Sequence, residues 1–100
     1  MFSIDLSDPI DREVVEAYSE ITEVEVIYRN RCHEDYYYWI FTSNRAYDDN
    51  LLDRMILIEQ GFMQRYRGEK TFDFRYVASV LAPIHREVVG STNPVLYSRC

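Results

Sequence analysis

The densest group of residues that could do chemistry is the run Cys-His-Glu-Asp at positions 32–35. Thiolate, imidazole and carboxylate groups are the ligands that proteins use for transition metals. Adjacent side chains in a loop rarely point at one ion, however, and the only other soft ligands in the chain are His85 and Cys100. We therefore expect a solvated loop at this run and no metal site.

The two histidines, His33 and His85, offer acid–base chemistry. His85 is followed closely by Glu87, and His33 is followed by Glu34. A histidine near a carboxylate can act as a general base, but no nucleophile stands at a recognisable spacing from either one. Surface histidines are the favoured interpretation. A small enzyme or ligand-binding domain that uses His85 or His33 is the alternative function.

Three acidic residues, Asp48, Asp49 and Asp53, could be read as a magnesium site, because Asp49 and Asp53 stand one helical turn apart. The positive end of a helix dipole explains the first two without a metal, and we prefer that explanation. The sequence has no phosphate-binding glycine loop, no Cys-x-x-Cys pair and no His-Glu-x-x-His motif. It predicts no metal and no cofactor, and it favours a non-enzymatic protein.

The composition is that of a globular domain, and it bounds the possible partners. One hundred residues, 47% of them hydrophobic, predict a single domain over positions 1–100. The net charge of −6 opposes binding to nucleic acid or to an anionic membrane. No apolar run is long enough for a membrane span, and the N-terminus lacks the pattern of a signal peptide. We expect a cytoplasmic protein whose two cysteines are free thiols.

Two segments have helical periodicity. The stretch from Asn44 to Gly68 carries apolar residues at steps of three and four, acidic residues near its start and basic residues near its end. Gly68 is suited to the left-handed conformation that closes a helix, and a packing reason is expected for Gly61 in the interior. A shorter helix is predicted at about residues 9–21, capped by Ser7 or Asp8 and begun by Pro9.

Four segments predict strands: residues 22–29, 36–42, 71–79 and 95–98. The first two form an antiparallel hairpin across a polar loop at residues 30–35. The fold class is therefore α+β, in the order α-β-β-α-β-β, with a mostly antiparallel four-stranded sheet and two helices on one face. The third strand pairs either with the first strand or, in parallel, with the second. Residues 80–94 favour a loop, with one helical turn possible at 84–89.

The open face of this sheet is the predicted interaction surface. In the second strand we place Tyr37, Trp39 and Phe41 in the core, because they form the larger and more hydrophobic set. That leaves the interface hypothesis to four other residues: Tyr36, Tyr38, Ile27 and Arg75. Exposed tyrosine, isoleucine and arginine resemble the composition of protein interfaces. A homodimer or a partner contact is predicted there, and a monomer with scattered surface tyrosines is the competing interpretation.

A third function, binding of single-stranded nucleic acid, rests on the same face. The segment FDFRYV at positions 72–77 has the aromatic residues on which bases stack in RNA-binding sheets. It lacks the glycine and basic residues of that motif, and the negative charge of the chain opposes the binding. The preferred function is therefore a non-enzymatic protein–protein interaction module, either a homodimer or a subunit of a complex.

Overall fold

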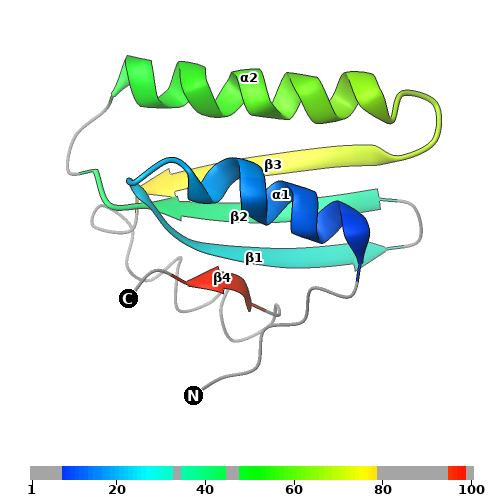
Figure 1. Cartoon of the computed structure of the whole chain (residues 1–100), viewed down its shortest axis with the longest axis horizontal. Coiled ribbons are helices and arrows are strands. Elements are labelled where there is room, and N and C mark those ends of the chain that lie inside the picture. Colours follow the sequence, from blue (N-terminus) through cyan, green and yellow to red (C-terminus); the bar gives the residue numbers. More distant parts are fainter. Residues whose placement is uncertain (1–7, 33–34, 45–47, 79–94, 99–100) are drawn as a thin grey trace.

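Two helices lie over one face of a four-stranded sheet in the computed structural model of the chain, which describes residues 8–32, 35–44, 48–78 and 95–98 (Figure 1). The predicted order α-β-β-α-β-β is confirmed. The elements are α1 (Pro9–Ser19), β1 (Val24–Cys32), β2 (Asp35–Thr42), α2 (Asp49–Arg65), β3 (Thr71–Ala78) and β4 (Val95–Ser98). His33, His85, Cys100 and the segment predicted as a loop at 80–94 lie outside the described residues.

The strand order is β3-β2-β1-β4, so the sheet is mixed. β1 pairs antiparallel with β2 and with β4, whereas β3 pairs in parallel with β2. Of the two pairings left open by the sequence, the parallel one with the second strand is correct. β1 also continues to Cys32, where a loop was predicted from Asn30, because Asn30 pairs with Tyr37 and extends the hairpin.

Both helices begin at an aspartate that caps them. The Asp8 side chain accepts a hydrogen bond from the Ile10 amide, 2.8 Å away, and the Asp48 side chain accepts one from the Leu51 amide at 3.1 Å. These bonds satisfy amide groups that have no partner within a first helical turn. After α2 the chain turns at Gly68, whose φ of +81° is the left-handed conformation expected for it.

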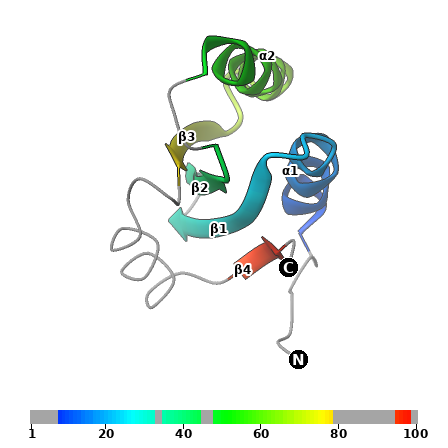
Figure 2. The same cartoon turned by 90° about the vertical axis from the view of Figure 1, so that its left-hand side faces the viewer.

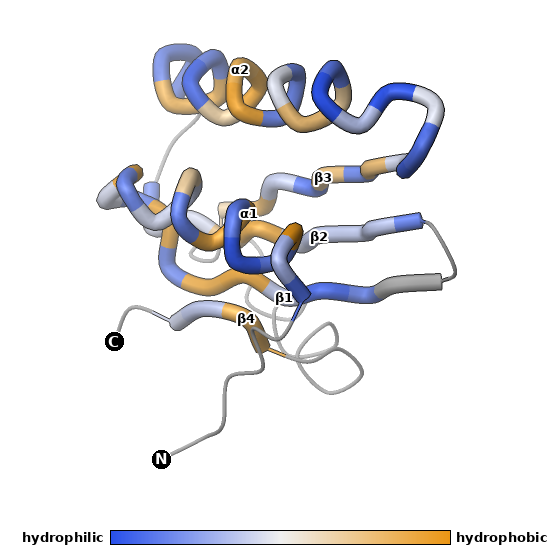
Figure 3. Tube along the Cα trace, turned by 45° about the vertical axis from the view of Figure 1, so that its right-hand side comes forward, coloured by the Kyte–Doolittle hydropathy of each residue, from blue (hydrophilic) through white to orange (hydrophobic). Residues whose placement is uncertain are grey.

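The main core lies between the sheet and the helices. Both helices stand on the same side of the sheet (Figure 2), and hydrophobic and hydrophilic positions alternate around them (Figure 3). Each helix turns its apolar stripe inward, as its periodicity predicts. The buried residues of this core include Val14 and Tyr18 of α1, Met55 and Phe62 of α2, and Phe74 of β3.

The predicted faces of the second strand are reversed. Tyr36 and Tyr38, which we expected on the open face, are 4% and 0% exposed and pack in the helix-side core. Phe41 is buried on the opposite face in a second cluster, with Trp39 packed against it, whereas Tyr37 is 38% exposed. The prediction ranked the two faces by the size and hydrophobicity of their side chains. That ranking assumed that burying a tyrosine hydroxyl is costly. The cost disappears when the hydroxyl finds a buried hydrogen-bond partner.

Ile27 was also expected on the open face, and it too lies in the helix-side core, fully buried. The reason is a β-bulge in β1. Val24 pairs with Thr42 and Val26 pairs with Phe41, so Glu25 is an extra residue between two adjacent pairing positions. A bulge shifts the alternation of side chains by one residue. Val24 and Ile27 therefore share the helix side, although simple alternation puts them on opposite faces.

Candidate functional site

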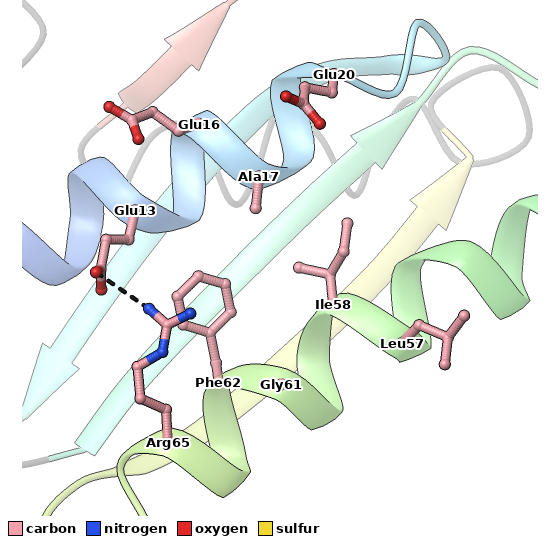
Figure 4. A pocket seen from close by; sticks show the side chains of 9 residues that line it. All are labelled: Glu13, Glu16, Ala17, Glu20, Leu57, Ile58, Gly61, Phe62 and Arg65. Atoms are coloured by element: carbon pink, nitrogen blue, oxygen red, sulfur yellow. Dashed lines mark hydrogen bonds and ion pairs between the residues drawn. The ribbon is translucent and has the colours of Figure 1, made fainter.

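A groove of about 460 Å³ runs between the two helices on the outer surface of the helical layer (Figure 4). We call it the interhelix groove. Its lining combines acidic, apolar and very small side chains. The residues that line it are Glu13, Glu16, Ala17 and Glu20 from α1, and Leu57, Ile58, Gly61, Phe62 and Arg65 from α2.

Helical spacing places these side chains along the groove. The α1 residues stand at positions 13, 16, 17 and 20, and four of the α2 residues stand at 58, 61, 62 and 65. Both sets follow the steps of three and four that keep side chains on one helix face. The helices run in opposite directions, so Glu13 lies near Arg65 at one end and Glu20 lies nearer Leu57 at the other (Figure 4).

Glu13 closes one end of the groove. Its Oε1 accepts a hydrogen bond from Arg65 Nη1 at 3.1 Å, and its Oε2 accepts one from the Tyr66 hydroxyl at 2.7 Å. The bond to Glu13, followed by partial burial, raises the pKa of Tyr66. The guanidinium of Arg65 also stands 5.5 Å from the centre of the Phe62 ring. This contact neutralises Glu13 and links the two helices.

The other two acids on the α1 side have no compensating charge among the described residues. Glu16 and Glu20 are exposed, and neither makes an ion pair with a residue in the described part of the chain. Between them Ala17 presents a single methyl group to the groove (Figure 4). The α1 rim of the groove is therefore negative, and it borders an apolar floor that includes Ile58 and Phe62.

The α2 side of the groove has two features that folding does not explain. Leu57 is 68% exposed, more than any other large hydrophobic residue described. Gly61 stands in the helix interior, where glycine costs roughly 1 kcal/mol relative to alanine. A β carbon added to Gly61 would meet nothing within 4 Å, so the internal packing reason we expected is wrong. Periodicity alone did not reveal the groove, although Gly61 and Leu57 were visible in the sequence as irregular positions.

A second polar cluster lies inside the molecule and is closed to ligands. Asp11 is fully buried, and it accepts hydrogen bonds from the Tyr38 hydroxyl at 2.7 Å and from Arg29 Nη1 at 2.5 Å. Burial is the main influence on this carboxyl and raises its pKa, against the opposing effects of Tyr38 and Arg29. Burial also raises the pKa of Tyr38. The cluster ties α1 to β1 and β2, and we assign it to stability.

A third polar cluster joins the two helices to β3 beneath the surface. The hydroxyls of Tyr18 and Tyr76 are 2.8 Å apart, and each lies 3.2 Å from the carbonyl oxygen of Met55. The Tyr76 hydroxyl also lies 2.8 Å from Glu59. Burial raises the pKa of both tyrosines, so they are neutral hydrogen-bonding groups. This cluster fixes the separation of the helices, and hence the width of the groove.

The other predicted site residues do not come together. Tyr36, Tyr38 and Ile27 are core residues, while Arg75 is exposed with its guanidinium 5.7 Å from the centre of the Trp39 ring. The aromatic rings of β3 that the nucleic-acid hypothesis required pack in the helix-side core. The alternative based on His33 and His85 concerns residues beyond those described.

The described segments contain no cluster of metal ligands and no helix that could span a membrane. Among residues 8–32, 35–44, 48–78 and 95–98, no three potential ligands gather as a metal site would require. The dipole argument placed both Asp48 and Asp49 in the first turn of the helix; Asp49 lies there, and Asp48 is the N-cap. Neither α1 nor α2 has the length and apolar character needed to cross a membrane.

Comparison with known proteins gives no match: no family model, no curated protein and no solved structure is significantly similar to the chain. The function is therefore argued from the geometry of the interhelix groove.

Proposed function

We propose that the protein is a non-enzymatic interaction module that binds a basic amphipathic helix of a protein partner in the interhelix groove. The observation that carries this proposal is Gly61. A glycine within a 17-residue helix has a stability cost, and no part of the described chain occupies the space beside it. Glycine is the residue that allows another backbone to approach closely. A partner that passes over Gly61 gives this residue a role.

The shape of the groove favours a helix as the partner. Its two walls are themselves helices, and they offer side chains at helical spacing over about two turns. Helices pack at axial distances of roughly 8–10 Å, and small residues at the contact permit the shorter distances. Ala17 and Gly61 supply such residues on opposite walls. A groove of this kind binds a helix through apolar residues that recur along that helix at steps of three and four.

The charge of the groove favours basic residues on that helix. Glu16 and Glu20 stand on the α1 rim with no ion-pair partner in the described part of the chain. Leu57 and the apolar floor would receive the hydrophobic stripe of the partner, and the rim would receive flanking lysine or arginine. Opposite charges at a rim mainly raise the association rate and select the correct partner.

A displayed peptide library tests this function. The library holds amphipathic helices of about 20 residues, which span roughly 30 Å, and their polar faces vary from acidic to basic. We expect the selected peptides to carry lysine or arginine beside an apolar stripe. Their binding should shift the amide NMR signals of Ala17, Ile58 and Gly61. Selection of acidic peptides, or signals that move on the opposite sheet face, would contradict the proposal.

A matched pair of charge reversals checks the binding surface. Glu16→Lys with Glu20→Lys should weaken a selected basic peptide about tenfold or more, because the rim becomes repulsive. Glu69→Lys with Asp73→Lys changes the net charge equally, but away from the groove. This control should change affinity less than about threefold, because salt screens distant charges. Equal losses in both variants would show that only net charge matters.

A further inference from the structure

We infer that the occupant of the interhelix groove is helix α2 of a second copy of the chain, so that two molecules pack through their helical layers as a symmetric dimer. This inference rests on the proposed function and names its partner. The surface proposed for self-association is therefore the helical layer, on the opposite side of the molecule from the open sheet face.

Helix α2 has the properties that the groove requires of its occupant. One exposed stripe along it follows steps of three and four and carries arginine on both sides of its centre, beside the exposed acid Asp53 four residues before Leu57. It consists of Arg54, Leu57, Gly61, Gln64 and Arg65, all of them exposed. The chain thus contains both an acidic groove and a helix whose exposed stripe carries two arginines, Arg54 and Arg65. Leu57 belongs both to the lining of the groove and to the exposed stripe of α2.

A twofold axis through Gly61 makes the two surfaces complementary. Around that axis the α2 helices run antiparallel, and Leu57 of one copy lies beside Arg65 of the other. The two glycines meet at the crossing, where neither has a β carbon and nothing in the described chain fills the space. The hydrophobic Leu57, 68% exposed in the single chain, is then covered. In a symmetric interface every such contact occurs twice.

The same axis brings unlike charges together. Within one chain α1 runs opposite to α2, with Glu13 at the Arg65 end and Glu20 nearer Leu57 (Figure 4). An antiparallel second α2 therefore directs its Arg65, which already pairs with Glu13 of its own chain, toward the Glu20 end, and its Arg54 toward the Glu13 end. Glu20 has no ion-pair partner among the described residues, and this contact would supply one. The charge pattern specifies the antiparallel orientation.

Two substitutions on α2 test the inference by light scattering over a series of protein concentrations. Leu57 and Met63 are the exposed large hydrophobic residues of this helix, and only Leu57 lines the groove. We expect a wild-type dimer. Leu57→Glu should weaken it by at least about 100-fold, because a central apolar contact is lost twice. Met63→Glu should leave it intact. Circular dichroism checks that both variants fold, as their exposure predicts.

A third variant, Gly61→Leu, fills the crossing point, and circular dichroism checks that it folds, since a β carbon at this position meets no other part of the described chain within 4 Å. It should also dissociate the dimer. A wild-type protein that is monomeric at every concentration would overturn the inference, as would a dimer that Met63→Glu dissociates and Leu57→Glu does not.

Failure of the inference and failure of the proposed function are distinguishable. A monomer that still binds basic helical peptides from the library in the groove would remove the dimer and keep the function. A monomer that binds none of them would remove both. A dimer resistant to Leu57→Glu and Gly61→Leu would place self-association elsewhere and overturn the inference, while the peptide measurements would decide the function separately.

Discussion

At the scale of single residues, the fold depends on tyrosine hydroxyl groups that we expected, from the sequence alone, to lie at the surface. Tyr38 belongs to a run of three tyrosines, of which Tyr36 and Tyr38 are buried and Tyr37 is exposed. Both buried hydroxyls reach aspartates near the start of α1, Tyr36 to Asp8 and Tyr38 to Asp11. Nothing in the residue types distinguishes the two faces of this strand. The distinction comes from long-range partners that only the folded chain brings together.

The first prediction concerns the buried bond between Tyr38 and Asp11. Tyr38→Phe keeps the ring but removes the donor 2.7 Å from a fully buried carboxylate. Loss of one partner from a buried polar group costs roughly 1–3 kcal/mol, and we expect the free energy of unfolding to fall by about that amount in urea titrations. The control, Tyr37→Phe, alters an exposed residue and should change stability by less than about 0.5 kcal/mol. Equal effects would contradict the assignment.

The second prediction concerns pH. Burial raises the pKa of Asp11 above its ordinary value of 3.8, so the folded protein holds this proton more tightly than the unfolded chain. Binding of this proton contributes its whole stabilisation of the fold below pH 3.8, the ordinary pKa. That stabilisation is lost as the pH rises through the higher pKa of Asp11 in the folded protein. The Asp11→Asn variant has no titrating group at this position. The unfolding free energy of the wild type minus that of Asp11→Asn should therefore fall as pH rises above about 4. A difference that is flat or rises would contradict the predicted direction of the shift.

At the scale of elements, periodicity predicted every helix and strand that the structure describes, because each has one face against the core. Boundaries were less predictable. The polar residues from Asn30 to Cys32 read as a loop, yet they are strand, because pairing with β2 satisfies their backbone groups. The bulge at Glu25 could not be predicted either, since it exists only relative to the partner strand. It moved Ile27 from the expected face into the core.

The third prediction separates the two glycines of the α2 region. Gly68 has a φ of +81°, which an L-residue adopts at a cost of roughly 1–2 kcal/mol. Gly68→Ala should lower the free energy of unfolding by about that amount, measured by urea or thermal denaturation. Unchanged stability would show that the turn can rearrange. The same substitution at Gly61, inside the helix, is expected to have the opposite sign.

The fourth prediction concerns the start of α2. Asp48 accepts a hydrogen bond from the Leu51 amide and caps the helix. Asp48→Ala should cost about 1 kcal/mol of stability, the usual value for a lost cap. Asp48→Asn keeps the acceptor and should retain most of that stability. If both variants are equally unstable, the charge of Asp48 rather than its hydrogen bond is the important property.

At the scale of the whole molecule, the sequence predicted the α+β class and the helical layer, but three of the four residues in its interface hypothesis, Tyr36, Tyr38 and Ile27, lie in the core and not on the open face. The tyrosines drew the interface hypothesis to the open face, whereas the exposed leucine, the unpacked glycine and two acids with no ion pair among the described residues lie on the helical layer. A groove between two helices depends on how far apart they sit. That distance is set by Tyr18, Tyr76 and the Met55 carbonyl, residues far apart in the chain.

The most direct test of the central claim is Gly61→Ala, measured in two ways on the same protein. Alanine should raise the free energy of unfolding by about 1 kcal/mol, because it favours the helix and its β carbon meets nothing within 4 Å. If the groove is a binding surface, the same methyl group should weaken binding of the best basic library peptide. A more stable protein with reduced affinity is the predicted result. A more stable protein with unchanged or improved affinity would contradict the account.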